Sequence, residues 1–203
     1  MIAPRLVIGL GNPGEEYAAT RHNCGFWLAE RLAGALSLAF GREARFHALA
    51  AHLRRPDLWL LLPQTFMNRS GLAAGAAARF FRIPPEAVLV LHDDLDLEPG
   101  ALRLKFGGGA GGHNGLKDLV AHLGSPDFWR LRIGIGHPGD RDEVIDYVLK
   151  APRAPEREAI EQALDRAVSA WPLMAAGQWP AAMQKLNLRK PVACAPEPRA
   201  DGG

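Results

Sequence analysis

The chain has 203 residues, of which 48% are hydrophobic and 23% are charged. These values are typical of one folded globular domain, and they exclude a disordered chain, a coiled coil and a collagen-like fibre. With 24 basic side chains against 22 acidic ones, the net charge of +2 lacks the strong basic excess that nucleic-acid-binding proteins often carry.

The cysteines and the apolar stretches indicate the cellular compartment in which the protein works. Cys24 and Cys194 are the only cysteines, and they predict no disulfide framework. Residues 6–10 form an apolar run that a turn follows at once, so it is too short for a signal peptide. No apolar stretch approaches the roughly 18 to 20 residues that cross a bilayer. We therefore expect a cytoplasmic protein that has no membrane contact.

The first sixty residues alternate between strand and helix patterns. The continuously apolar run at residues 6–10 is typical of a strand that is buried on both faces of a sheet. Apolar positions then recur at spacings near three and four, which predicts an amphipathic crossover helix at residues 21–37. A turn-like break separates residues 44–53 from residues 58–62, and these two segments are expected to form a strand pair.

The middle of the chain places acidic residues at the end of a buried strand. Asn68 or Ser70 is the expected cap of an alanine-rich helix that continues through Phe81. Residues 87–91 then form an apolar strand that leads directly into the sequence HDDLD at residues 92–96. Ligands bind at such carboxyl ends of strands in open α/β sheets.

The remaining segments continue the alternation. A half-solvated strand at residues 102–106 leads into the glycine-rich loop 107–112, and a helix at residues 116–123 and a strand at residues 131–135 follow. The sequence also predicts helices at residues 143–149, 156–176 and 180–188, and a mobile tail at residues 191–203.

Strands that alternate with helices predict the fold class. We expect a single α/β domain over residues 1–190, with a twisted, mixed and mostly parallel sheet that is flanked by helices on both faces. The alternating strands in the middle of the chain are the reason for expecting a mixed sheet.

The sequence GLGNPG at residues 9–14 formally matches the dinucleotide-binding pattern G-x-G-x-x-G. Pro13 removes a backbone N–H that would donate to pyrophosphate, and no acidic residue ends a second parallel strand about 20 residues on. A tight turn is the better interpretation. It leaves Asn12 as a polar side chain at the carboxyl edge of the first strand.

Three histidines fall at strand-to-helix connections, which converge on one edge of a doubly wound sheet. These residues are His22, His92 and His113. A neutral imidazole takes a proton from water near pH 7, and a nearby carboxylate, here one of Asp93, Asp94 and Asp96, fixes its tautomer. The alternative for each histidine is a structural or solvated role.

Other reaction types have weaker support. There is no G-x-S-x-G serine motif, and Cys24 is best interpreted as a small buried residue rather than a nucleophile. The aspartates at residues 93, 94 and 96 could join histidines at a metal, but H-E-x-x-H and C-x-x-C are missing. The sequence therefore predicts no metal site.

The charges of two neighbouring segments differ from the net charge of the whole chain. Residues 86–98 hold five acidic and no basic side chains, whereas residues 99–139 hold five basic against two acidic ones. Basic residues on two strands that flank a glycine-rich loop are compatible with a phosphate-binding surface. A solvated strand face explains the same charges equally well.

Taken in order, the motifs resemble those of the bacterial peptidyl-tRNA hydrolase family. The resemblance covers about residues 5–150 and continues more weakly to about Asn187. The motifs that carry it are GLGNPG (9–14), TRHN (20–23), PQTFMNRSG (63–71), HDDLD (92–96), GGGAGGHNGLK (107–117) and RLRIGIGHPG (130–139).

The resemblance implies a role for each matching residue. His22 matches the catalytic base that activates water, and Asp93 matches the carboxylate that supports it. Asn12 resembles the residue that separates blocked peptidyl-tRNA from free aminoacyl-tRNA. The positions that resemble the rest of the substrate cleft are Tyr17, Phe66, Met67, Asn68, His113 and Asn114. The positions that match a basic patch for tRNA phosphates are Arg103, Lys105 and Arg130.

The same resemblance implies the activity. Members of the family are monomeric cytoplasmic esterases that free tRNA from peptidyl-tRNA released prematurely by ribosomes, with no metal or cofactor. We therefore expect peptidyl-tRNA to be the partner of this chain, and tRNA recycling for translation to be its role. A non-catalytic tRNA-binding module that uses the same basic patch is the alternative hypothesis.

Overall fold

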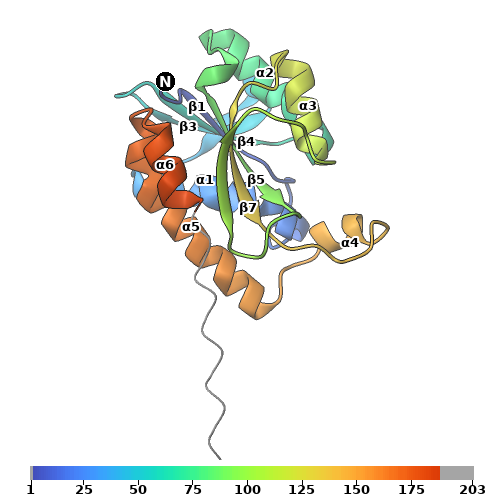
Figure 1. Cartoon of the computed structure of the whole chain (residues 1–203). Coiled ribbons are helices and arrows are strands. Elements are labelled where there is room, and N and C mark those ends of the chain that lie inside the picture. The colour runs from blue at the N-terminus through green and yellow to red at the C-terminus, as the bar shows by residue number, and fades with distance from the viewer. Residues whose placement is uncertain (1, 188–203) are drawn as a thin grey trace, which may run out of the picture.

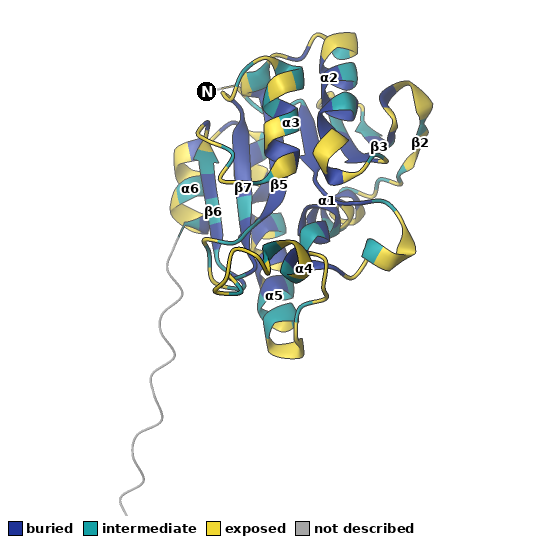
Figure 2. Ribbon diagram, turned by 90° about the vertical axis from the view of Figure 1, so that its right-hand side faces the viewer, coloured by how far each residue is buried: buried dark blue, intermediate teal, exposed yellow. Residues whose placement is uncertain are grey.

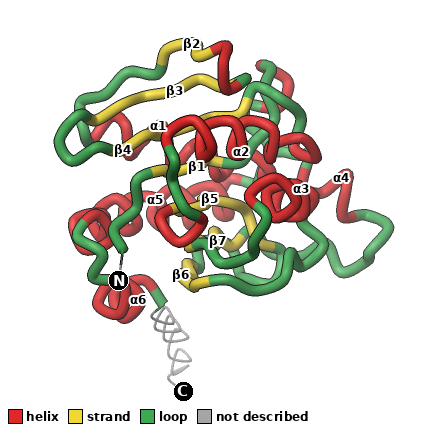
Figure 3. Tube along the Cα trace, turned by 90° about the horizontal axis from the view of Figure 1, so that it is seen from above, coloured by secondary structure: helices red, strands yellow, loops and turns green. Residues whose placement is uncertain are grey.

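A seven-stranded sheet forms the centre of the fold, with its strands in the order β2-β3-β4-β1-β5-β7-β6 (Figures 1 and 3). The computed structural model describes residues 2–187, and the tail expected at residues 191–203 lies outside them. The strands are β1 (Leu6–Gly9), β2 (Gly41–Glu43), β3 (Ala48–Leu53), β4 (Leu58–Pro63), β5 (Val88–Asp94), β6 (Leu102–Phe106) and β7 (Trp129–Gly134).

The sheet is mixed, as the sequence predicts. β4, β1, β5 and β7 pair with one another in parallel, whereas β2–β3, β3–β4 and β6–β7 are antiparallel pairs. Only β3 and β6 therefore run against the direction of the other strands. The antiparallel pairs lie at the two edges of the sheet. The parallel centre brings the carboxyl ends of four strands to one edge, which is where ligand sites form in open sheets.

Helices cover both faces of the sheet, as expected. One face packs against α1, α5 and α6, and the other packs against α2 and α3. None of the helices in the described part of the chain is long and apolar enough to cross a membrane. The helices are α1 (Cys24–Ala35), α2 (Ser70–Phe81), α3 (Asn114–Leu123), α4 (Val144–Val148), α5 (Ala154–Ala175) and α6 (Trp179–Leu186).

The neighbouring strands β5 and β7 are buried along almost their whole length (Figure 2). Side chains alternate between faces along a strand. Leu89 and Leu91 of β5 therefore pack toward α1 and α5, while Val88 and Val90 pack toward α2 and α3. This alternation places consecutive polar residues at the end of β5 on opposite faces.

Two local predictions need correction. The segment expected as a strand at residues 44–53 begins with a single 3₁₀ turn, Ala44–Phe46, and only Ala48–Leu53 pairs with β4. Neither Asn68 nor Ser70 caps α2, because Arg69 is the capping residue and Asn68 lies in the preceding 3₁₀ turn. The Ser70 hydroxyl instead donates to the Met67 carbonyl oxygen at 2.9 Å.

A glycine lets α1 lie directly on the carboxyl ends of the central strands. A Cβ atom on Gly25 would lie 2.3 Å from the Leu91 carbonyl oxygen and 2.5 Å from the Leu10 nitrogen. Both partners are backbone atoms, which cannot rotate away. The absence of a side chain at Gly25 thus brings the turn that precedes α1, including His22, down onto the end of β5.

Changing Gly25 to alanine is expected to destabilise the fold by about 1–3 kcal/mol or more, because the methyl group overpacks the helix against strand backbone. Gly34 is the matched control in the same helix, since a Cβ there meets no atom within 4 Å. Gly34→Ala should raise stability by about 0.5–1 kcal/mol through helix propensity. Urea unfolding measures both changes, and equal midpoints for the two variants would contradict the close approach.

Candidate active site

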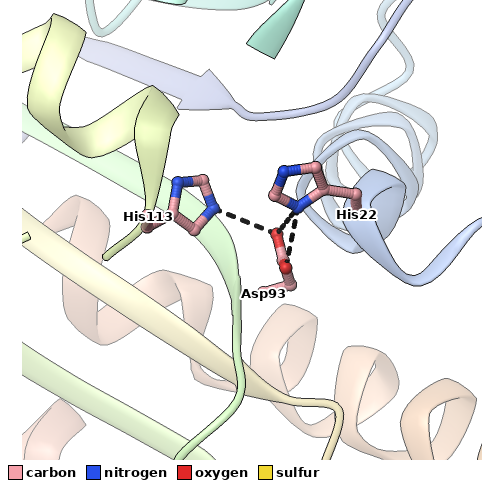
Figure 4. A group of neighbouring side chains, drawn as sticks. All are labelled: His22, Asp93 and His113. Atoms are coloured by element: carbon pink, nitrogen blue, oxygen red, sulfur yellow. Dashed lines mark hydrogen bonds and ion pairs between the residues drawn. The ribbon is translucent and has the colours of Figure 1, made fainter. Parts of the chain in front are cut away.

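Three polar side chains meet at the carboxyl edge of the sheet. His22 lies in the 3₁₀ turn Arg21–Asn23 that precedes α1, and Asp93 lies near the end of β5. His113 is the residue that immediately precedes α3. Figure 4 shows both imidazole rings directed at the Asp93 carboxylate. The structure thus brings together three of the residues that the sequence singled out, from three separate connections.

The hydrogen bonds define the tautomers of both imidazoles. His22 Nδ1 lies 2.9 Å from Asp93 Oδ2 and 3.0 Å from Oδ1, and His113 Nε2 lies 3.1 Å from Oδ1. An ionised carboxylate only accepts hydrogen bonds, so both nitrogens carry the proton. His22 Nε2 is then an unprotonated nitrogen, and it lies on the side of the ring away from Asp93 (Figure 4).

Electrostatics strengthen His22 as a base. Burial lowers the pKa of His22, but the charge of Asp93 and the hydrogen bond to it have the larger combined effect, and the pKa is raised above 6.5. Burial alone would raise the pKa of the Asp93 carboxyl, yet the two neighbouring imidazoles hold that pKa far below its usual range. Asp93 therefore stays ionised while His22 titrates.

His92 has a different role from the other two histidines. It lies on the opposite face of β5 from Asp93, and its Nδ1 donates to the Asp93 backbone carbonyl at 2.7 Å. Burial, with the nearby His113, lowers the pKa of His92 to about 3. His92 is thus neutral at physiological pH. The unprotonated Nδ1 of His113 accepts from the Leu116 backbone N–H at 3.4 Å, so among the described residues only His22 offers a base nitrogen beside Asp93 that has no protein partner.

Asn12 and Asn23 form a pair of amides beside the His22 turn. The Asn23 side chain accepts from the Asn12 backbone N–H at 2.9 Å and donates to the Asn12 carbonyl at 3.0 Å. The Asn12 Oδ1 in turn accepts from the Met67 backbone N–H at 2.7 Å. Asn12 is only 5% exposed, and its Nδ2 forms no hydrogen bond with the described residues. The amide group of Asn12 is therefore fixed with its donor end unused.

The other expected cleft residues lie on the loops next to this pair. The rings of Tyr17 and Phe66 meet edge to face with their centroids 6.2 Å apart. Met67 is buried, and its sulfur packs so closely on Gly115 at the start of α3 that a Cβ there would lie 2.6 Å away. These contacts join the loop after β1, the loop after β4 and the start of α3 into one surface.

Asn68 and Asn114 are the two exposed amides of the candidate site. Asn68 lies in the 3₁₀ turn Met67–Arg69, and Asn114 is the first residue of α3. Within residues 2–187, neither side chain forms a hydrogen bond to the protein. Both amides can therefore donate to and accept from a ligand.

The predicted basic patch is only partly available to a ligand. Arg103 and Lys105 of β6 lie opposite Arg132 and Arg130 of β7, so all four share one face of the sheet. Arg130 is 2% exposed, and its guanidinium donates to carbonyl oxygens of the glycine loop 107–112 at 2.5 and 2.6 Å. The expectation that Arg130 faces a phosphate is corrected. The glycine loop covers this residue, and carbonyl oxygens of the loop accept the hydrogen bonds of its guanidinium group.

The triad of His22, Asp93 and His113 is the only group of potential metal ligands found in the described part of the chain. One ligand atom from each of His22, Asp93 and His113 lies within 4.8 Å of the others. A metal ion there would have to displace the hydrogen bonds that both imidazoles make to Asp93. Cys24 is fully buried and burial raises the pKa of its thiol, in agreement with its interpretation as a core residue.

Two residues that hold the His22 turn were not identified from the sequence. Asn23 fixes Asn12 as described above. Arg21 is a buried arginine that hydrogen-bonds the same turn to residues 147–156. No local pattern reveals these partners, since they lie up to 130 residues away. The Arg21 guanidinium donates to the carbonyl oxygens of Tyr147, Lys150 and Ala151 and to the carboxylate of Glu156.

Comparison with known sequences gives the family. The family described as peptidyl-tRNA hydrolase matches residues 6–193. A peptidyl-tRNA hydrolase of Azoarcus sp. strain BH72 is 62% identical over 92% of this chain and 85% of its own length. The corresponding protein of Aromatoleum aromaticum is 63% identical over 92% of this chain and 95% of its own length.

Solved structures agree with the sequence comparison. The structure of the Arg119Gln mutant of peptidyl-tRNA hydrolase from Acinetobacter baumannii superposes with a TM-score of 0.91 at 47% identity, covering 95% of this chain and 98% of that one. Another structure of the enzyme from the same organism gives a TM-score of 0.89 at 46% identity, covering 93% and 97%. Sequence, fold and the ordered motifs together show that this chain belongs to the peptidyl-tRNA hydrolase family.

Proposed function

We propose that this chain hydrolyses the ester between peptide and tRNA by general-base catalysis at His22. The observation that carries the proposal is the pair of hydrogen bonds from His22 Nδ1 to Asp93, which leaves Nε2 free to take a proton from water. As Nε2 becomes protonated, the ionised Asp93 stabilises the imidazolium that forms. The resulting hydroxide attacks the ester carbonyl, and tRNA leaves as the alcohol.

An ester needs less catalytic apparatus than an amide. Its alkoxide leaving group departs more readily than an amine, so activated water can suffice without a covalent nucleophile. The developing oxyanion still needs donors, and Asn68 and Asn114 each offer an N–H₂ group that the protein does not occupy. We assign these amides to the ester and the peptide backbone. Contacts to the backbone do not read side chains, which suits an enzyme that accepts many peptides.

The fixed amide of Asn12 accounts for selection of blocked substrates. Its Oδ1 is already occupied by the Met67 N–H, so only the donor Nδ2 can face a ligand. A donor pairs with the carbonyl oxygen of an N-acylated amino acid. The ammonium group of a free aminoacyl-tRNA carries only donors and would leave Nδ2 unpaired. Asn12 is therefore assigned to the separation of peptidyl-tRNA from aminoacyl-tRNA.

Release of free tRNA from N-acetylaminoacyl-tRNA tests the proposed function. The proposal predicts hydrolysis of this substrate, little hydrolysis of the unblocked aminoacyl-tRNA, and no loss of activity with a chelator. Binding without release would support the non-catalytic alternative, which the family match does not favour. Loss of activity with a chelator that returns with added metal would instead point to a metallohydrolase.

Arg103 and Lys105, which are partly exposed, give a further prediction about tRNA binding. Arg103→Ala or Lys105→Ala should weaken binding and make its salt dependence shallower, because each lost phosphate contact lowers the slope of log K against log salt by about 0.7–0.9. Filter binding of tRNA at several salt concentrations measures the slope. Arg42→Ala, an exposed arginine on the opposite edge strand β2, is the control. An unchanged slope in both the Arg103 and the Lys105 variant would move the tRNA contact elsewhere.

The partner and the compartment follow from the same proposal. Peptidyl-tRNA arises where ribosomes translate, so we place the protein in the cytoplasm with peptidyl-tRNA as its partner. All residues assigned above come from a single chain, and a monomer is therefore sufficient. Sedimentation at the concentrations used for the assay tests the monomer.

A further inference from the structure

A cavity of about 330 Å³ opens next to Asn12, on the side of α1 that faces the β3–β4 hairpin. Asn12 and Asn23 form one end of it, so it is continuous with the amide pair beside His22. Phe26, Trp27 and Leu62 form apolar walls. The mechanism proposed above uses none of these walls.

The charged residues of the cavity are all acidic. Glu15 and Glu30 line it together with neutral side chains, and no lysine, arginine or histidine does. Neither carboxylate forms an ion pair within residues 2–187. Both glutamates are exposed at the surface end of the cavity, and partial burial raises the pKa of Glu30. The cavity therefore has negative charge that the protein itself does not compensate.

Two arginines close in the sequence or in space to residues of the cavity wall form ion pairs with carboxylates of α5. Arg31, next to Glu30 in the chain, pairs with Glu161 and Asp165 of α5. Arg157 stacks on Trp27 with its guanidinium carbon 3.8 Å from the ring centroid, and it pairs with Glu161. Neither arginine reaches into the cavity to neutralise Glu30.

Apolar walls beside unpaired carboxylates suit one class of ligand. A lysine or arginine side chain has an alkyl stem that packs on apolar surface and a cationic head that carboxylates attract. We propose that this cavity is a subsite for a lysine or arginine side chain of the substrate peptide, close to the ester-linked end. The inference rests on the proposed function, and its occupant reaches the cavity past Asn12.

A side-chain series on a single tRNA tests the subsite. Acetylated substrates carry lysine, norleucine or glutamate, either as the ester-linked residue or as the residue before it. In one of the two series we expect kcat/KM for lysine to exceed that for norleucine by about twofold to fivefold, the range for an exposed ion pair. The glutamate substrate should be the slowest of the three.

Glu30→Gln removes the charge but keeps the shape, so it should bring the lysine-to-norleucine ratio close to one. Glu86→Gln makes the same charge change at an exposed position before β5, at the opposite end of that strand from Asp93, and should leave the ratio unchanged. A ratio near one for the wild-type protein in both series, or a ratio that survives Glu30→Gln, would overturn the subsite. Failure to hydrolyse even the norleucine substrate would instead overturn the proposed function.

Discussion

Replacing His22 by alanine is expected to lower kcat/KM for N-acetylaminoacyl-tRNA by about 10²- to 10⁴-fold, because the only base that can activate water is lost. Binding of tRNA should change little, since the His22 side chain is only 14% exposed and, among the described residues, its ring nitrogens hydrogen-bond only to Asp93. Single-turnover hydrolysis measures the chemical step without product release.

His52→Ala is the matched control for the loss of an imidazole. His52 pairs with Asp57 and stacks on Trp59 in the β3–β4 hairpin, away from the candidate site. It should keep near-normal hydrolysis. If His22→Ala retained activity within a few-fold of the wild-type protein, the proposed mechanism would fail, whatever its effect on tRNA binding.

Asp93→Asn is expected to cost about 10³- to 10⁴-fold in kcat/KM, by analogy with the loss of the supporting aspartate in other histidine-based sites. The amide can donate to His22 Nδ1, which places the imidazole proton on Nε2 and removes the base. The charge that stabilises the imidazolium is lost as well. Hydrolysis of N-acetylaminoacyl-tRNA under single-turnover conditions measures the effect.

Asp96→Asn changes the same chemical group three residues further on. Its side chain is 78% exposed and interacts only weakly with Arg132, at 3.8 Å. We expect less than a tenfold effect from this control. Comparable losses in both variants would mean that the acidic segment acts through its general field rather than through one carboxylate.

The fold was predictable where the local pattern and the packing agree. The apolar runs of β1 and β5 have no polar face, so a buried parallel strand is the simple solution. The start of β3 was less predictable, because Ala44–Phe46 has the composition of a strand but forms a turn that buries Phe46. The start of α2 was also less predictable, because Arg69 occupies the cap position without a side-chain capping bond and the Ser70 hydroxyl donates back to the Met67 carbonyl oxygen.

The site was predictable only as far as short motifs reach. The ends of predicted elements indicated three histidines and three aspartates, and only the resemblance to the family singled out His22 and Asp93. Arg130 was misplaced because alternation identifies the face of a strand but not the loop that covers it. Asn23 and Arg21 were missed because their roles depend on partners in distant segments.

The near-neutral total charge concealed an uneven distribution. The acidic segment at residues 86–98 contains Asp93, whose charge supports His22. In the basic segment that follows, Arg103 and Lys105 are partly exposed, while Arg130 donates to the glycine loop and Arg132 donates to Asp94. A modest patch suits an enzyme that has to release its tRNA product.

The pH dependence of kcat/KM tests the central claim most directly, because it reports the pKa of the base in the free enzyme. For the wild-type protein the rate should rise with pH through a midpoint above 6.5, the ordinary pKa of histidine, since Asp93 raises the pKa of His22. In Asp93→Asn only burial remains, so the midpoint of the residual activity should fall. A profile with no acid limb, or a midpoint that does not move in Asp93→Asn, would contradict catalysis by the His22–Asp93 pair.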